Sequence, residues 1–276
     1  MTLLPLAPLL DQRPRPTVPY EWSWALHPSV LLGTGLLGAL YFYGIGPWRR
    51  RRGLPPVQRW RVASFCEALL VLLGALNGPL HDLSDYYLFS VHMVQHLLLT
   101  LVFPPLLLLG TPGWLLEPLL RPPAVRRVAR VLTQPVVAAV IYSVTIAMWH
   151  LAPYYDVMMR NHDVHILTHL MFMATATLLW WPVMSPVPEL LPRLPYGLGM
   201  LYLFLVGIPM QIVAAMITLS DGVLYPWYAA APRTWGLSPL EDQQLGGLLM
   251  WVPGNLYLFL AIGVVFFVWA REEGER

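Results

Sequence analysis

Long apolar stretches recur along the chain, and each approaches or exceeds the roughly 18 residues that a helix needs to cross a bilayer. Short segments rich in arginine, proline or acidic residues separate them. The stretches lie at 28–46, 61–78, 87–109, 135–152, 164–183, 198–219 and 246–269. The pattern predicts an all-α fold, namely a polytopic membrane helix bundle with seven transmembrane helices.

Composition supports this class and excludes others. Only 12% of the 276 residues are charged, and the mean hydropathy is +0.57. A soluble domain would carry about twice that charged fraction. The single cysteine, Cys66, rules out an internal disulfide and a Cys-x-x-Cys metal or redox pair. We expect the lipid bilayer as a partner and no nucleic acid.

The connections between the apolar stretches are short, so we expect one domain. The predicted organisation is a short external segment at 1–27, a single seven-helix transmembrane domain at 28–270 and a short cytoplasmic tail at 271–276. No basic residue precedes the first apolar run, and prolines break it, so a cleaved signal peptide is not expected. The longest connection, 220–245, is rich in Trp, Tyr and Pro, which is typical of a cap at the membrane interface.

Arginine is distributed unevenly between the two sets of loops. Thirteen of the 17 arginines lie between spans one and two, three and four, or five and six, or after span seven. Because loops rich in basic residues stay in the cytoplasm, the N-terminus is predicted outside and the C-terminus inside. This orientation places all eight histidines at the outer side of the membrane.

Two pairs of histidines share one spacing. His92 and His96 lie four residues apart at the start of span three, and His165 and His169 repeat the spacing in span five. Residues four apart share a helix face, and both spans enter the membrane from the same side. Neutral imidazole is the commonest metal ligand, and it suits copper, zinc, iron or nickel. We predict a metal site at these four residues, with His150, at the end of span four, as an additional ligand.

Several other polar residues are weaker candidates. Those near the predicted site are His81, His162, Asp82, Asp85 and Asp163. His27 is expected to be a hydrogen-bonding residue at a helix end. Glu67, in span two, is either a proton or ion relay or the partner of a neighbouring helix. Interhelical hydrogen bonds are expected from Gln95, Gln211 and Asn255. Core packing, rather than ligation of copper(I) by a thioether, is expected for Met210, Met216 and Met250.

Other metal chemistries fit the sequence less well or remain open. A zinc protease of the H-E-x-x-H type needs a glutamate where this chain has Gln95. Di-iron desaturases use adjacent His-His pairs, and the chain has none. A seven-span zinc hydrolase stays open, because Asp82, Asp85, Asp156 and Asp163 lie near the histidines and an aspartate can orient a water. A b-type haem held between histidines also stays open.

The segment DLSDYYLFSVHMVQHLLLTLVFPPLLLLGTP at 82–112 resembles the signature of the bacterial CtaG family, the membrane assembly factors of caa-type cytochrome c oxidase. The similarity continues through WHLAPYYD (149–156), HDVHILTHLMFMATATLLWWPV (162–183) and DQQLGGLLMWVPG (242–254). It covers most of the chain from about residue 25. One departure is Thr168, at a position where the family pattern leads us to expect an acidic residue.

The resemblance implies a role rather than a reaction. It implies a multi-pass protein of the bacterial plasma membrane that is not an enzyme and that assists oxidase maturation. Its partners would be oxidase subunits or other assembly factors. The implied cofactor is copper, delivered to the oxidase from the outer face, with zinc as the alternative ion and haem as a third possibility. A metal-dependent membrane hydrolase is the hypothesis from a different functional class.

Overall fold

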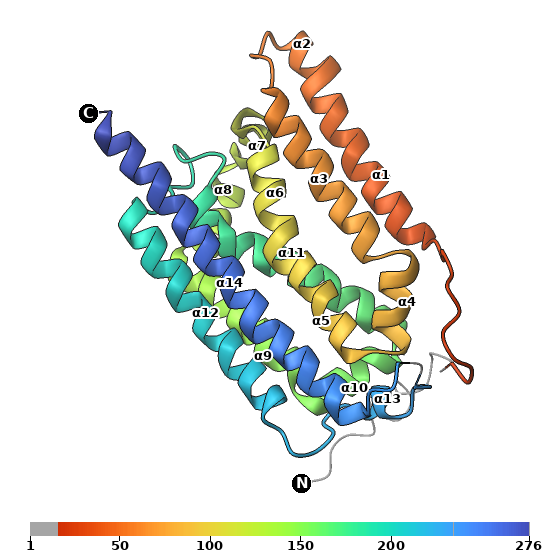
Figure 1. Ribbon diagram of the computed structural model, residues 1–276. Coiled ribbons are helices and arrows are strands. Elements are labelled where there is room, and N and C mark those ends of the chain that lie inside the picture. Colours follow the sequence, from red (N-terminus) through yellow and green to blue (C-terminus); the bar gives the residue numbers. More distant parts are fainter. Residues whose placement is uncertain (1–15, 234, 276) are drawn as a thin grey trace.

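The computed structural model describes residues 16–233 and 235–275, and these residues form an elongated helical bundle without strands (Figure 1). Five helical segments are long and apolar enough to cross a membrane. Two bent helix pairs, each taken as one span, raise the number to seven at most. The all-α prediction is therefore confirmed, and the structure contains five to seven candidate spans.

The first half of the chain contributes α1 and α3, which run side by side along one edge of the bundle, and the more central α5 and α6 (Figure 1). Its helices are α1 (Pro28–Tyr43), the π-helical η2 (Gly44–Trp48), α2 (Arg49–Arg51), α3 (Arg59–Ala75), α4 (Gly78–Tyr86), α5 (Phe89–Leu97), the π-helical η3 (Leu98–Val102), α6 (Phe103–Gly110), α7 (Gly113–Leu120) and α8 (Pro123–Leu132). The remaining helices are α9 (Pro135–His150), α10 (Ala152–Arg160), α11 (His162–Met184), α12 (Tyr196–Thr218), α13 (Pro226–Ala229) and α14 (Pro239–Gly274). Residues 271–274 of the predicted tail thus continue α14.

The bend of 48° between α3 and α4 occurs at a glycine. Gly78 has φ +62°, a left-handed conformation that favours glycine. A Cβ at Gly78 would also lie 2.7 Å from the Trp24 ring, so the segment before α1 packs directly on this bend. The bend turns α4 across the end of the bundle, where it carries His81 and Asp85.

Two consecutive prolines account for the π-helical turn between α5 and α6. Pro104 and Pro105 have no N–H, so the carbonyl oxygens of Thr100 and Leu101 lose their helical donors. The Trp180 indole, on α11, donates to the Thr100 carbonyl oxygen over 3.1 Å instead. This bond fixes the middle of the span that carries His92 and His96 against the helix that carries His165 and His169.

Helices α3 and α6 approach each other closely at Gly110. A Cβ added there would lie 2.6 Å from the Phe65 backbone nitrogen, closer than real Cβ contacts. We expect Gly110→Ala to lower the free energy of unfolding by about 1–3 kcal/mol, the usual cost of overpacking. Thermal unfolding in detergent measures this cost. Gly74→Ala, on α3 with nothing within 4 Å of the added Cβ, is the matched control and should be neutral or slightly stabilising. Equal effects of the two substitutions would contradict the close approach.

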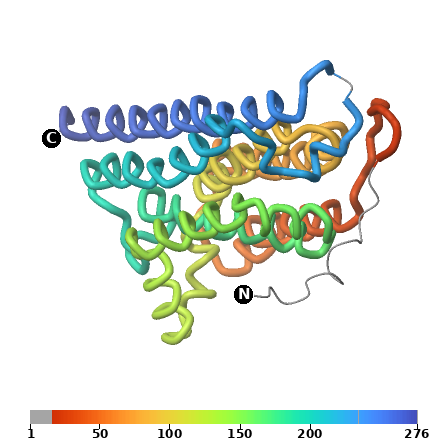
Figure 2. Tube along the Cα trace, turned by 90° about the horizontal axis from the view of Figure 1, so that it is seen from below, coloured from red at the N-terminus to blue at the C-terminus, as the bar shows by residue number. Residues whose placement is uncertain are grey.

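The second bent pair departs from a simple span. Helix α8 has no buried residue and meets α9 at 67°, and Figure 2 shows this yellow-green segment projecting from the bundle. Its three arginines and its exposed valines lie on different faces, a pattern typical of helices along a membrane surface. The predicted fourth span therefore corresponds to the 16-residue α9.

One end of the bundle, which we call the histidine end, holds α4, α10 and α13 (Figure 1). The connection at 220–245 was expected to lie at the membrane interface. In the structure, three of its aromatic side chains, Tyr225, Trp227 and Tyr228, are buried and only 2–3% exposed, whereas Trp235 is 44% exposed. The polar atoms of these three buried side chains donate hydrogen bonds inward. The Trp227 indole donates to the Asp85 backbone carbonyl oxygen, and the Tyr225 hydroxyl to that of His150.

Candidate metal centre

Three histidines from two helices converge at the histidine end. His92 comes from α5, and His165 and His169 come from adjacent turns of α11. One ring nitrogen of each lies within 4.8 Å of those of the other two. All three side chains are buried, with 0%, 2% and 5% exposure. Within the described residues, this triad is the group of three or more His, Cys, Asp or Glu side chains that converges closely enough to hold one metal ion.

Asp242 fixes the start of α5, immediately before His92. Its carboxylate accepts hydrogen bonds from the Phe89 and Ser90 backbone N–H groups, at 2.9 and 3.1 Å, and from the Ser90 hydroxyl at 2.6 Å. Asp242 thereby caps the helix from 150 residues away and complements the positive end of its dipole. The carboxylate is fully buried, and Arg233 lies 3.7 Å from it.

Backbone carbonyl groups orient two of the imidazoles. His92 Nδ1 lies 3.2 Å from the Ser84 carbonyl oxygen, and His150 Nδ1 lies 2.8 Å from that of Ile146. A neutral ring that donates from Nδ1 keeps a lone pair on Nε2, the arrangement found in histidine metal ligands. The Nε2 atoms of His92 and His150 are buried and have no hydrogen-bond partner among the described residues.

His96 and His150 continue the cluster beyond the triad. The His96 ring lies 4.2 Å from that of His92, 5.6 Å from that of His169 and 5.7 Å from that of His150, between centroids. Both His96 nitrogens are buried without a hydrogen-bond partner in the described chain. The five predicted ligands are therefore brought together as a converging triad and an adjoining pair.

Asp85 connects the triad to a further histidine. One carboxylate oxygen lies 3.4 Å from His165 Nε2, and the other lies 3.5 Å from His81 Nε2. Asp85 is fully buried. The Gln95 amide nitrogen lies 3.0 Å from His81 Nδ1 and 2.7 Å from the Ala75 carbonyl oxygen, so it fixes the His81 ring. A carboxylate against a ligand imidazole raises the basicity of that ligand.

The remaining weak candidates lie outside the triad. Asp82 accepts a hydrogen bond from the Ser23 hydroxyl, Asp156 pairs with Arg160 at 2.7 Å, and Asp163 is exposed in the first turn of α11. His162 is also exposed, one turn before His165.

The other polar residues that the sequence indicated within the spans lie in different surroundings. Thr168 is buried and donates to the Val164 carbonyl oxygen of its own helix. The predicted interhelical hydrogen bonds are confirmed, from Gln95 to Ala75 and from Gln211 to Asn255. Glu67 is exposed on α3 and is not part of the cluster.

The three methionines also differ in their surroundings. Met210 and Met250 pack in a core cluster, whereas Met216 is 63% exposed.

The donor set fits a transition-metal ion. Three buried imidazoles on two rigid helices present nitrogen ligands, which suit copper or zinc. Haem fits less well, because the rings contact one another at centroid distances of 4.2–6.0 Å and leave no slot for a porphyrin between them. Phe172 closes the cluster further, with its ring 4.7 Å from that of His96.

Comparisons with known proteins place the chain in a family. The family model for cytochrome c oxidase caa3 assembly factors matches residues 39–272, which include the triad and Asp242. The chain is 28% identical over 268 residues to uncharacterised proteins of Mycobacterium bovis and Mycobacterium tuberculosis, covering 89% of this chain and 39% of each relative. An uncharacterised Mycobacterium leprae protein is 25% identical over 257 residues, which cover 86% of this chain and 38% of that relative.

This chain thus spans about two fifths of the length of those relatives. No solved structure matches it. The family model covers most of the chain and every helix from α3 to α13. The protein belongs to the cytochrome c oxidase caa3 assembly factor family.

Proposed function

We propose that this protein holds copper at His92, His165 and His169 and provides it to cytochrome c oxidase during assembly. It acts through oxidase subunits or other assembly factors and catalyses no reaction of its own. The convergence of the three imidazoles in a family of oxidase assembly factors carries the proposal.

Burial makes the cluster costly without a ligand. Each buried polar atom that lacks a hydrogen bond costs about 1–3 kcal/mol. In the described chain, His92 Nε2, His150 Nε2 and both His96 nitrogens are such atoms. A metal ion at the triad would offset this cost for His92, and His96 and His150 would lie close beside it. Packing alone gives no reason to gather so many imidazoles in an apolar bundle.

Asp85 supplies the charge that a buried cation requires. Neutral imidazoles leave the charge of the ion uncompensated, and burying an unpaired charge is expensive. The Asp85 carboxylate lies 3.4 Å from His165 Nε2, so it lies next to the triad rather than at a distant surface. Imidazole accepts zinc as well as copper. Copper is favoured because cytochrome c oxidase is a copper enzyme and this family assembles it.

We further propose that the histidine end faces the outside of the bacterial plasma membrane. The arginine-rich loops support this orientation, because they lie at the opposite ends of the helices. A reporter fused after Arg130 should therefore read cytoplasmic, and one fused near residue 235 should read external. A cytoplasmic signal from the second fusion would contradict delivery from the outer face.

Deletion of the gene tests the role in assembly. At limiting copper, the deletion strain should show lower oxidase activity and lower copper content of the oxidase, with unchanged transcripts of the oxidase subunits. Complementation with the wild-type chain should restore both, and complementation with His92→Ala should not. Normal oxidase copper in the deletion strain would contradict the proposal.

A metal-dependent hydrolase at the outer leaflet is the second candidate. A pocket with apolar walls, about 490 Å³ in volume, reaches His165, His169 and Asp85. Such a pocket suits an apolar substrate, and a carboxylate near a metal can orient a water. Turnover of a lipid or peptide substrate by the purified metal-loaded protein would favour this candidate. Stoichiometric metal binding without turnover favours assembly.

A further inference from the structure

Among the described residues, aromatic side chains close the triad on the side of α10 and α13. Tyr155, Trp227 and Tyr228 cover it there and are 1–3% exposed. The Tyr155 ring lies 5.7 Å from the His92 ring, between centroids, and the Tyr228 hydroxyl donates to the Ser84 carbonyl oxygen that also faces His92. Phe172, which is fully buried, covers the side of His96. A metal ion therefore needs another route to the triad.

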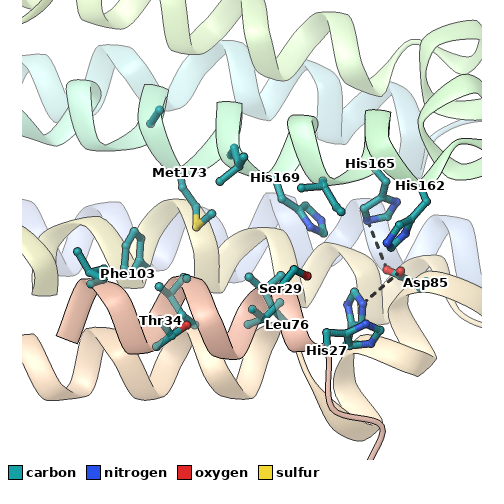
Figure 3. Close-up of a pocket in the computed structure, with 18 of the residues that line it drawn as sticks. His27, Ser29, Thr34, Leu76, Asp85, Phe103, His162, His165, His169 and Met173 are labelled. Carbon is teal, nitrogen blue, oxygen red and sulfur yellow. Dashed lines mark ion pairs between the residues drawn. The ribbon is translucent and has the colours of Figure 1, made fainter. Parts of the chain in front are cut away.

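The pocket of about 490 Å³ provides that route. It lies between α1 and α11, and two triad members, His165 and His169, form part of its wall (Figure 3). Most of its length is apolar, with side chains such as Leu37, Phe103 and Met173. Its histidines and Asp85 gather at the end near the start of α1 and α11. The pocket therefore combines an apolar interior with a mouth of histidines.

Four residues at this mouth form what we call the loading site: His27, His81, His162 and Asp85. His27 and His162 stand on opposite walls, α1 and α11, with Asp85 between them (Figure 3). The His27 and His81 rings lie 4.3 Å apart, between centroids.

Exposure falls from the mouth toward the triad. His162 is exposed, His27 is partly buried, His81 is 7% exposed and Asp85 is fully buried. Asp85 in turn lies 3.4 Å from His165 of the triad. The side chains thus form a continuous series of ligand groups from the surface to the metal centre.

We propose that the loading site captures the metal ion and passes it to the triad. The inference rests on the proposed metal-binding function and adds the path by which the ion arrives. A hydrated divalent ion exchanges water for imidazole at His162 and His27. The Asp85 carboxylate compensates the charge of the ion. One of its oxygens lies next to His81 and the other next to His165. Transfer is ligand exchange without oxidation or reduction.

Hydrogen bonds hold the mouth in place. The His27 backbone N–H donates to the Asn77 side chain over 2.8 Å, and the Gly78 N–H donates to the Ala25 carbonyl oxygen over 2.8 Å. These bonds tie the segment before α1 to the α3–α4 bend. His27 lies outside the segment that the family model matches, so its part in the loading site comes from the structure alone.

The rate of metal uptake tests the loading site separately from the triad. Purified protein in detergent is mixed with Cu²⁺ bound to a chromogenic chelator, and the transfer of copper is followed over time. The variant His27→Ala/His162→Ala should load several-fold more slowly, because it lacks two of the four side chains that capture the ion. Its final stoichiometry and equilibrium affinity should equal those of the wild type. Thr177→Ala, at the apolar part of the same pocket, is the matched control.

A second variant leaves every histidine in place. Ser29 is exposed on the α1 wall of the pocket, and Ser29→Leu should narrow the mouth and slow loading as well. Wild-type rates in both variants would overturn the loading site. A lower final stoichiometry in the double variant would also overturn it, because these histidines would then be ligands of the bound metal rather than of the loading site. Absence of uptake by the wild type would instead reject the proposed function itself.

Discussion

Alanine at His92 or His169 should lower the affinity for copper by about 100-fold or more, the largest effect that we expect from any single substitution. Loss of even a group outside the ligand sphere typically costs 10–100-fold in metal affinity. Each of these residues supplies one of three converging nitrogens, and the described triad contains no spare ligand at the same distance. The fold should survive, because the Tyr228 hydroxyl also donates to the Ser84 carbonyl oxygen that His92 faces.

Competition against a chelator of known affinity, with each purified variant, measures this loss. His96→Ala should have a smaller effect, because His96 lies beside the triad and not within it. Thr177→Ala is the control, about two turns farther along α11, with its hydroxyl bonded within its own helix. If both His92→Ala and His169→Ala bound copper with wild-type affinity, these histidines would have a structural role only.

Asp242→Ala should lower the free energy of unfolding by about 3 kcal/mol. The substitution removes a charged acceptor from three hydrogen bonds, and bonds to charged groups and helix caps contribute about 1–3 kcal/mol each. It also leaves Arg233 without the carboxylate 3.7 Å away. Because the bonds secure the first turn of α5, the substitution should also weaken metal binding through His92.

Thermal unfolding in detergent, together with the chelator competition, gives both readouts. Glu241→Ala is the matched control from the same turn of α14, because Glu241 makes an exposed capping bond to the Ser238 backbone N–H. Its cost should be clearly smaller than that of Asp242→Ala, with unchanged metal affinity, because its capping bond is exposed to solvent. Equal unfolding free energies for the two variants would contradict the capping role of Asp242.

Local patterns in the sequence predicted most of the fold. Apolar length predicted the helical spans, because a bilayer requires about 20 apolar residues per helix. The spacing of four between His165 and His169 predicted that both face one direction, and the structure places both in the triad. The same spacing did not predict that His92 would converge with them while His96 stays beside them. That choice depends on how α5 rotates and crosses α11, which no local pattern encodes.

Long-range contacts account for what the sequence did not indicate. Asp85 was one of several acidic candidates, and only the bend at Gly78 places it between His81 and His165. Asp242 gave no local signal, because its partners Phe89 and Ser90 lie about 150 residues earlier. His27 was expected to be only a hydrogen-bonding residue at a helix end. The packing of α1 places its ring against that of His81.

The ligand set of copper in protein purified from its native membrane tests the central claim most directly. X-ray absorption at the copper edge reports the number and type of atoms around the ion. The proposed centre predicts about one copper per chain, bound by three imidazole nitrogens at roughly 2.0 Å, with no sulfur ligand. The His92→Ala/His169→Ala variant, purified in the same way, should lose this signal. Wild-type protein without copper, or with copper bound by sulfur, would contradict a histidine triad as the metal centre.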